Sequence, residues 1–455
     1  MRVSYLMGDY AWDFYLVKLS DKRDFMKKSF VPLIVVILVG CGGDSEESIN
    51  IDLSSDNNTD GVTEAPPSNF AIPDTLTVVA SAKTYNCDSS FPYADATVLM
   101  HDINGDLISS NSVDEQGTLT IDRPENAVHI SVYGDEGLRQ TSIDSFLYFS
   151  EEVLPISFIS LQQENCSCES VTIDDADLKA QLPTYKFIYN EDFHDDDNTV
   201  SICRSTDGAW PSINVFLHDE SSVSSSYSAK YDIDPTETSI ITLEMADFSE
   251  GERLTINSTY AYDAYQSAIV VAGLEIISIR NIDTDGDNIW QFPNNFSEHI
   301  AIAGDFEVLS GGEYYQSVSH SKVVDGVANF TDVHAKELFA EKVTDWQNYF
   351  MDTQIDYDFS GLGLAKTGIS IGQQNTNFVW SVSAPLIGTI NQLQLPEALQ
   401  TKYESQSFEE LSVFLIANGS ESTYGLVAID ATTMTATEYS EAISKFNYEV
   451  VTLGR

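Results

Sequence analysis

Basic residues are scarce in this chain of 455 residues: 22 lysines and arginines stand against 71 aspartates and glutamates, a formal net charge of −49. Binding to a nucleic-acid backbone needs clustered basic side chains, because each one replaces a counterion of a phosphate. The charge therefore excludes nucleic acid as a partner, and it also excludes electrostatic docking on anionic lipid. The acidic excess predicts a strongly hydrated surface that repels itself at low salt.

Sequence signals for hydrolytic catalysis are also few. The seven histidines are scattered and form no His-Glu-x-x-His motif. His334 and Glu337 have a spacing seen in zinc carboxypeptidases, but no arginine signature or third ligand follows. Gly368-Ile-Ser-Ile-Gly372 matches a nucleophile elbow, which requires a helix immediately afterwards. Residues 373–377 (QQNTN) begin a helix poorly, so ordinary strand alternation explains the match and no catalytic residue is predicted.

The chain lacks an apolar run long enough to cross a bilayer at its start. Phe30–Val39 is about ten residues long, whereas a spanning helix needs ~20. Lys27 and Lys28 precede this run, and Leu-Val-Gly-Cys ends it at Cys41. That layout is typical of a secretion signal. Its ending resembles the lipobox of bacterial lipoproteins, which implies lipid attachment at Cys41; Gly42 then favours transport to the outer membrane.

The signal also divides the N-terminal part of the chain. Residues 1–25 contain four aspartates, which a secretion signal would lack, so we predict a misassigned extension there and a true start at Met26. Residues 26–40 are then the lipoprotein signal peptide. Residues 41–71 are polar, acidic and almost free of aromatics, which predicts a flexible tether.

Cysteine is rare beyond the lipobox, with only Cys87, Cys166, Cys168 and Cys203 remaining. An even number in an exported chain predicts two disulfides. Cys166 and Cys168 are too close in sequence to bond each other comfortably. We therefore expect one of them to bond Cys87 and the other to bond Cys203. The alternative is a metal site at the Cys166–Cys168 pair, but no second such pair lies nearby.

Short strands and tight turns dominate the first folded region. Ala96–Asp102 is an apolar run, Asn104-Gly105 is a strong hairpin signal, and Asp114–Thr118 turns the chain again. Together with the strand that ends at Tyr133, these motifs resemble the carboxypeptidase regulatory-like and transthyretin-like β-sandwiches. The resemblance covers residues 72–165 and implies an accessory binding or spacer module without a reaction of its own.

The rest of the chain keeps the same strand-like pattern, with serine- and aspartate-rich loops. We predict a second β-rich domain at 166–309 and a C-terminal β-rich domain at 310–455. One helix is expected after Thr331, because Val343 and Trp346 fit a helical stripe. The predicted fold class is mainly β: two or three Ig-like or transthyretin-like sandwich domains in tandem, with few short helices.

One segment has the spacing of a calcium loop. Asp283, Asp285 and Asp287 supply carboxylates at positions one, three and five, and Ile289 supplies a carbonyl at position seven. The segment resembles the loops of thrombospondin type 3 repeats and dockerins. Asn294 occupies the twelfth position instead of a bidentate glutamate, so an acidic turn between strands is an equal alternative. The denser acidic run at 192–198 is expected to be a solvated loop.

These observations favour a non-catalytic, lipid-anchored protein of the bacterial cell envelope that acts as a binding or scaffolding module. Its expected partners are the membrane, through the anchor, and an envelope protein or glycan; calcium is the only candidate cofactor. One alternative is a polysaccharide-recognition lipoprotein of an uptake system, which aromatics exposed in a row on one sheet would support. A glycan hydrolase, with two carboxylates about 5–10 Å apart in a cleft, is the other. The tryptophans Trp210, Trp290, Trp346 and Trp380 are expected in cores or interfaces rather than on sugars.

Overall fold

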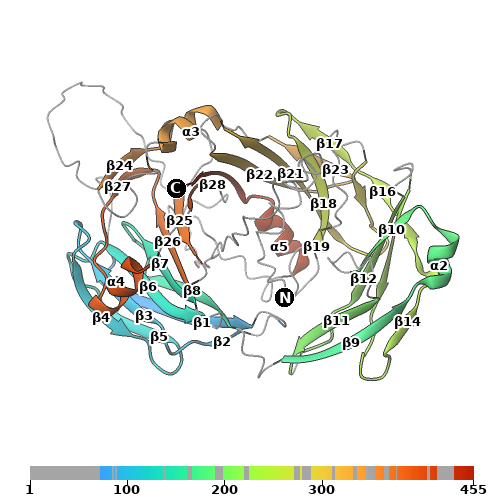
Figure 1. The fold of residues 1–455 in the computed structure, drawn as a ribbon, viewed down its shortest axis with the longest axis horizontal. Helices are drawn as coiled ribbons and strands as arrows, with labels where there is room; N and C mark the ends of the chain where they lie inside the picture. The colour runs from blue at the N-terminus through green and yellow to red at the C-terminus, as the bar shows by residue number, and fades with distance from the viewer. Residues whose placement is uncertain are drawn as a thin grey trace.

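The computed structural model describes residues 72–84, 87, 90–136, 140–160, 166–189, 198–206, 208–219, 225–270, 277–278, 288–309, 313–331, 336–344, 346, 354–362, 368–375, 377–406, 410–417 and 435–454. Within these residues the chain is mainly β, with several sheets and four short α-helices, which confirms the predicted fold class. Two sandwiches lie at opposite ends of the molecule, and a large sheet extends from the first towards the second (Figure 1). None of the helices in the described part of the chain is long and apolar enough to cross a membrane.

The first sandwich contains eight strands. They are β1 (Thr75–Thr84), β2 (Ser90–Pro92), β3 (Thr97–His101), β4 (Leu107–Ser112), β5 (Thr118–Asp122), β6 (His129–Glu136), β7 (Gln140–Phe146) and β8 (Val153–Ser160). Strands β2, β1 and β5 form one sheet with β8, and β4, β3, β6 and β7 form the facing layer. In β1 the buried positions alternate, so Leu76 and Val78 point into the core and meet Val98 and Ile130 from the other layer.

The hairpin predicted at Asn104-Gly105 joins β3 to β4. Asp102 stabilises the turn, because its Oδ1 accepts hydrogen bonds from the backbone N–H groups of Asn104 (2.8 Å) and Asp106 (3.0 Å). Gly105 has a φ of +89°, and a Cβ at this position would lie 2.4 Å from the carbonyl oxygen of Gln392. The turn therefore requires glycine both for its backbone conformation and for the close contact with the C-terminal part of the chain.

The second sandwich follows directly. Its elements are β9 (Cys166–Asp174), α2 (Ala176–Gln181), β10 (Tyr185–Tyr189), β11 (Thr199–Ser205), β12 (Ile213–Asp219), β13 (Ser226–Tyr231), β14 (Ile240–Thr242), the 3₁₀ turn η1 (Met245–Asp247) and β15 (Ser249–Glu250). One sheet has the order β11-β9-β14 and the other β10-β12-β13-β15. Val171 and Ile202 from the first sheet pack on Val215 and Leu217 from the second, so two tandem sandwiches are present, in agreement with the predicted fold class.

The remaining elements build the large sheet and its surroundings. They are β16 (Glu252–Arg253), β17 (Thr255–Ser258), β18 (Ala264–Val270), β19 (Ile277–Ser278), β20 (Trp290–Gln291), β21 (Glu298–Val308), β22 (Tyr314–Lys322), β23 (Val327–Phe330), α3 (Lys336–Thr344), β24 (Ile355–Asp358), η3 (Ser360–Leu362), β25 (Gly368–Gln374), β26 (Phe378–Ala384), β27 (Ile387–Ile390), α4 (Glu397–Glu404), β28 (Glu410–Ala417), α5 (Ala436–Ile443) and β29 (Asn447–Gly454). Helix α3 is the one predicted after Thr331.

Twelve strands form this sheet in the order β19-β18-β21-β22-β29-β28-β25-β26-β7-β6-β3-β4. The parallel pairing of β26 with β7 joins the C-terminal strands to the first sandwich. The sheet thus takes strands from each of the ranges 72–165, 166–309 and 310–455. It therefore continues across the domain boundaries predicted from the sequence.

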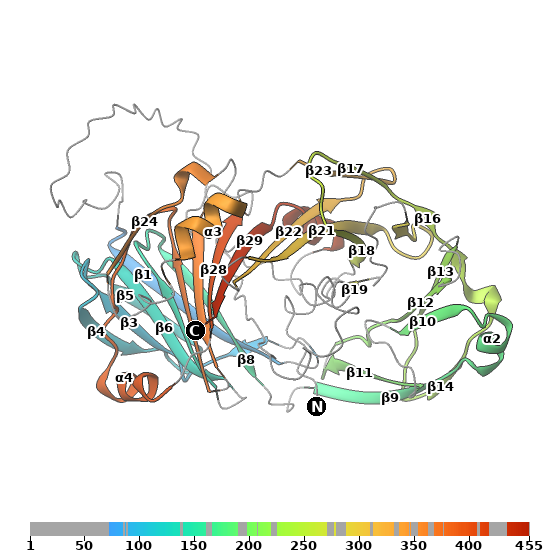
Figure 2. The same cartoon turned by 45° about the horizontal axis from the view of Figure 1, so that its top comes forward.

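Helix α5 covers part of one face of the large sheet, where Tyr439 and Ile443 pack with Val318 and Ile302 (Figure 2). Thr435 caps this helix, and its side chain accepts a hydrogen bond from the backbone N–H of Glu438. The second sandwich packs against the sheet through a separate cluster. That cluster consists of Ile188, Phe216, Ile269, Trp290, Phe292 and Phe296.

Candidate functional site

The four cysteines after the lipobox form two disulfides, Cys87–Cys166 and Cys168–Cys203. This confirms the predicted disulfides and also the expectation that Cys166 and Cys168 bond different partners. The first bond connects the region of the first sandwich to the first strand of the second. The second bond lies within the β9–β11 pair, where Cys203 is directly opposite Cys168.

Several predicted residues lie outside the part of the chain that the structure describes. These are the extension 1–25, the signal 26–40, Cys41, the tether up to residue 71, and the loop carboxylates Asp283, Asp285 and Asp287. Ile289 is described and fully buried, and its carbonyl oxygen accepts a hydrogen bond from the backbone N–H of Leu254 (2.8 Å). Among the described residues no group of three or more histidine, cysteine or acidic side chains could hold a metal ion. Calcium binding therefore stays a prediction.

The segments considered for catalysis have ordinary structural places where they are described. Ser370 lies inside strand β25, which continues through a hairpin into β26, so it is not at a strand-to-helix turn. Glu337 lies in the first turn of α3, and His334 is outside the described residues. Of the acidic run at 192–198 only Asn198 is described, and its amide donates a hydrogen bond to Asp175 Oδ1 (3.1 Å).

The four tryptophans in the described part of the chain do not form an exposed row. Trp290, Trp346 and Trp380 are buried. Trp210 is half-buried, and the guanidinium of Arg204 lies 4.3 Å from its ring centroid. Three of the four therefore belong to cores, as expected, and the fourth has one face occupied by a cation.

The second sandwich contains partly exposed tyrosines that could contact a ligand. Tyr185 on β10 and Tyr227 and Tyr231 on β13 are all half-buried and border the core of this sandwich. They share one face of their sheet, because Tyr227 is opposite Leu217 and Tyr231 is opposite Ile213. Met245 and Phe248 border the same core and are also half-buried. We call these five residues the tyrosine surface.

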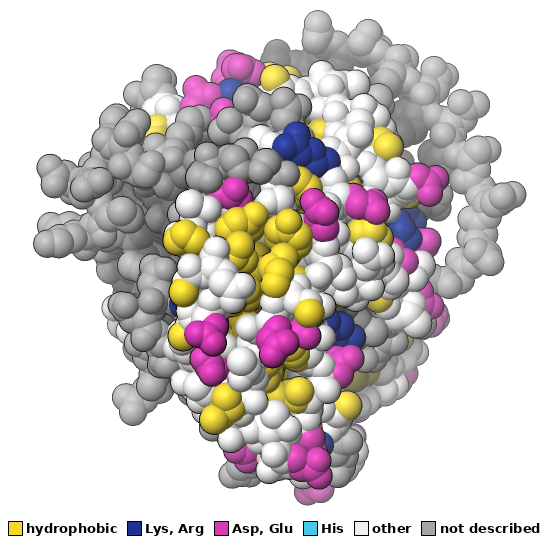
Figure 3. All heavy atoms as spheres, turned by 90° about the vertical axis from the view of Figure 1, so that its right-hand side faces the viewer, with side chains coloured by type: hydrophobic (Ala, Val, Ile, Leu, Met, Phe, Trp, Pro, Cys, Tyr) yellow, Lys and Arg dark blue, Asp and Glu magenta, His cyan; other side chains and the backbone are white. Residues whose placement is uncertain are grey.

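Figure 3 shows the end of the molecule at which the second sandwich lies. Hydrophobic side chains gather at the centre of this face, and acidic side chains lie around them. Phe187 and Tyr189, on the same side of β10 as Tyr185, are buried, whereas the residues of the tyrosine surface are half-buried. Aromatic rings in such a position combine an apolar face with a polar hydroxyl, a combination enriched at binding surfaces.

Two of these rings form a tilted pair. The centroids of Tyr185 and Tyr227 are 6.1 Å apart, with an angle of 41° between the ring planes. The hydroxyl of Tyr185 lies 2.6 Å from Ser225 Oγ, and the hydroxyl of Tyr231 donates to Asp247 Oδ2 (3.1 Å). These hydrogen bonds hold the phenol ends in place, so the rings are fixed before any ligand arrives.

The electrostatic environment of the tyrosine surface is negative. Glu250 is opposite Tyr227 in the β13–β15 pair. Burial and the Asp247 carboxylate raise the pKa of Tyr231, and burial together with the Tyr185 hydroxyl raises the pKa of Tyr227. Both phenols therefore stay protonated at neutral pH, and the nearby carboxylates are acceptors for hydroxyl groups of a ligand.

A second unusual group lies in the large sheet. Asp144 on β7 is 3 % exposed, on the face that carries the first core, between Val132 and Ser381. Desolvation raises the pKa of its carboxyl to about 7, although a hydrogen bond from Ser381 opposes the shift. Its Oδ2 has no hydrogen-bond partner among the described residues. No pattern in the sequence distinguished this residue from the other acids.

Comparisons with known proteins add little. No family model and no curated protein matches the chain. Two B repeat units of the collagen-binding protein of Staphylococcus aureus align with 9% identity over 74% of this chain and 92% of that chain, at a TM-score of 0.13. The Bacteroides ovatus protein SGBP-B of a mixed-linkage glucan utilization locus, in complex with a heptasaccharide, aligns with 11% identity over 85% and 97%, at a TM-score of 0.10. At such scores neither likeness carries an argument about this chain.

Proposed function

We propose that this chain is a non-catalytic, lipid-anchored protein of the bacterial cell envelope whose tyrosine surface binds an uncharged polysaccharide. The observation that carries the proposal is the set of three half-exposed tyrosines on one face of a single sheet. Flat aromatic rings pack against the apolar faces of sugar rings, and the phenol hydroxyls and carboxylates beside them bind sugar hydroxyls.

The charge of the chain decides which polysaccharides fit. With a net charge of −49 and Glu250 and Asp247 beside the rings, a polymer of uronic acids or sulfated sugars would be repelled. An uncharged chain has no such cost, and it can donate hydroxyl hydrogens to the carboxylates. The lipid at Cys41 would hold this surface at the membrane, with residues 41–71 as a spacer.

Binding to soluble polysaccharides tests the proposal directly. Affinity electrophoresis and calorimetry with the full chain in detergent would compare a panel of uncharged glucans, xylans and mannans with a carboxymethylated version of each. We expect at least one uncharged polymer to bind and its carboxymethylated version to bind more weakly. If no uncharged polymer binds, or if the carboxymethylated polymers bind better, the assignment of the tyrosine surface is wrong.

Substitutions locate the binding on the protein. An aromatic contact contributes roughly 0.5–1.5 kcal/mol, so Tyr185→Ala and Tyr227→Ala should each weaken binding by about 2- to 12-fold. Tyr314→Ala is the matched control, because Tyr314 is also half-buried but lies on β22 of the large sheet. Equal loss in all three variants would show that the polysaccharide binds elsewhere, and unfolding curves would confirm that each variant is folded.

A further inference from the structure

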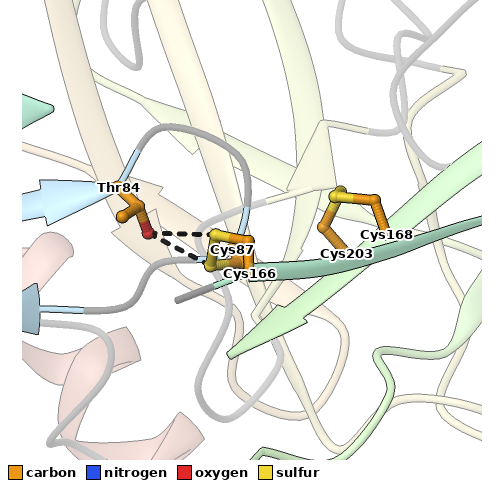
Figure 4. The surroundings of a disulfide bond; sticks show 5 residues. All are labelled: Thr84, Cys87, Cys166, Cys168 and Cys203. Atoms are coloured by element: carbon orange, nitrogen blue, oxygen red, sulfur yellow. Dashed lines mark hydrogen bonds between the residues drawn. A yellow bond between two sulfur atoms is a disulfide. The ribbon is translucent and has the colours of Figure 1, made fainter. Parts of the chain in front are cut away.

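The two disulfides lie next to each other along β9 but in different surroundings (Figure 4). Cys168 is exposed and Cys203 half-buried, on the outer side of the β9–β11 pair, because the alternate residues Val171 and Ile202 point into the core. Cys87 and Cys166 are both half-buried. A thiol in solution therefore reaches the Cys168 sulfur more easily than any of the other three.

The surroundings of the Cys87–Cys166 bond reinforce this difference. The hydroxyl oxygen of Thr84, which is 2 % exposed, lies 3.1 Å from the Cys87 sulfur and 3.5 Å from the Cys166 sulfur. A buried group thus covers one side of that bond, as Figure 4 shows. Within the described part of the chain, no hydrogen bond to the sulfur of Cys168 or Cys203 is found.

Opening the Cys168–Cys203 bond would also disturb little of the fold. The β9–β11 pair keeps seven opposed residue pairs, from Thr199 opposite Thr172 to Ser205 opposite Cys166. These backbone hydrogen bonds hold Cys168 and Cys203 opposite each other whether or not their sulfurs are bonded. The bond can therefore open and close again in place, whereas Cys87–Cys166 links segments 79 residues apart.

We propose that Cys168–Cys203 is a site of thiol–disulfide exchange, opened by an exported dithiol while Cys87–Cys166 persists. One thiolate of the dithiol attacks the Cys168 sulfur; a bond between the two sulfurs forms, the Cys168–Cys203 bond breaks, and Cys203 leaves as a thiolate. The second thiolate of the dithiol then attacks the first sulfur of the same dithiol. A disulfide forms within the dithiol, the bond to Cys168 breaks, and Cys168 leaves as a thiolate. The dithiol loses two electrons and becomes a disulfide, and the two cysteines gain them.

The acidic surface gives this exchange a charge preference. The whole chain carries a net charge of −49; the adjacent Glu169 is exposed as well, although it lies on the other face of β9, opposite Ile202. A thiolate that carries a further negative charge is repelled, and one with an ammonium group is attracted. Rates of mixed-disulfide formation should therefore rank cysteamine above 2-mercaptoethanol and 2-mercaptoethanol above mercaptoethanesulfonate at low salt, with the differences shrinking as salt is added.

The test uses the unmodified full chain under native conditions. Limiting dithiothreitol is added, samples are quenched with N-ethylmaleimide over time, and peptide mass spectrometry measures the label at each cysteine. We expect Cys168 and Cys203 to be labelled about tenfold faster than Cys87 and Cys166, since exposed disulfides exchange most readily. Three results would each overturn the proposal: all four cysteines are labelled at one rate, Cys87 and Cys166 are labelled first, or no cysteine is labelled before denaturant is added.

A variant provides the matched control. Thr84→Val removes the hydroxyl beside the Cys87–Cys166 bond and alters neither Cys168 nor Cys203. It should change the labelling rate of Cys87 and Cys166 while that of Cys168 and Cys203 stays the same. If both pairs change together, the two bonds open in one common unfolding event, and the exchange site is not independent.

Discussion

Replacing Asp144 by asparagine should stabilise the protein at alkaline pH and much less in mild acid. The pKa of this carboxyl rises from 3.8 to about 7 in the folded protein, mainly because burial disfavours its charged form. The folded protein therefore binds this proton more tightly than the unfolded chain does. Its contribution to stability is complete below about pH 4 and is lost as pH rises through 7, and at 1.4 kcal/mol per pKa unit the loss is about 4 kcal/mol.

Asparagine keeps an oxygen for the Ser381 hydroxyl but has no charge to bury. Any pH-independent cost of the substitution cancels when two pH values are compared. The free energy of unfolding of Asp144→Asn relative to wild type should thus rise by about 2.5 kcal/mol between pH 5 and pH 8.5. Urea unfolding followed by tryptophan fluorescence at both pH values measures this quantity.

A companion variant tests the cause of the shift. Ser381→Ala removes the hydrogen bond that favours the charged carboxylate, so it should raise the pKa of Asp144 further. Its cost should be larger at pH 8.5 than at pH 5. A stability difference between Asp144→Asn and wild type that is the same at both pH values would refute the argument, because Asp144 would then ionise alike in the folded and unfolded states.

Three further predictions follow from the same principles. Burial lowers the pKa values of His101, His129 and His299 to about 4, so on acidification the unfolded chain binds these protons before the folded protein does. The free energy of unfolding should therefore fall from pH 6.5 towards pH 4, by about 2 kcal/mol per histidine at pH 5, and urea titrations measure this fall. If the calcium loop forms, calcium should raise the thermal midpoint relative to chelator, and Asp285→Asn should abolish the rise. Metabolic labelling with an alkyne fatty acid should mark the chain in a bacterial host, and Cys41→Ser should remove the label.

Much of the fold was predictable because its signals are local. The apolar run Ala96–Asp102 predicted a strand, and Asn104-Gly105 predicted the hairpin between β3 and β4. The even number of cysteines predicted two bonds, and the sequence closeness of Cys166 and Cys168 decided that they have different partners. Each of these features depends on residues a few positions apart.

The tyrosine surface was missed for a recognisable reason. Tryptophans were considered as sugar platforms, yet three of the four are buried. Tyr227 and Tyr231 are four positions apart in one strand, which places them on the same face. The sequence shows this spacing, but whether the two rings are buried or half-buried depends on tertiary packing, which a local pattern does not predict.

Residue type and short-range spacing explain the acidic surface, the strand-rich composition, the turns and the number of disulfides. The pairing of β7 with β26, which extends the first sandwich into a twelve-stranded sheet, depends instead on contacts between residues far apart in the chain. Tertiary packing also buries Asp144 in that sheet, together with Asp305 and Glu449. Backbone hydrogen bonds between strands are alike for every residue type, so strand partners distant in sequence are selected by the packing of side chains from the whole chain.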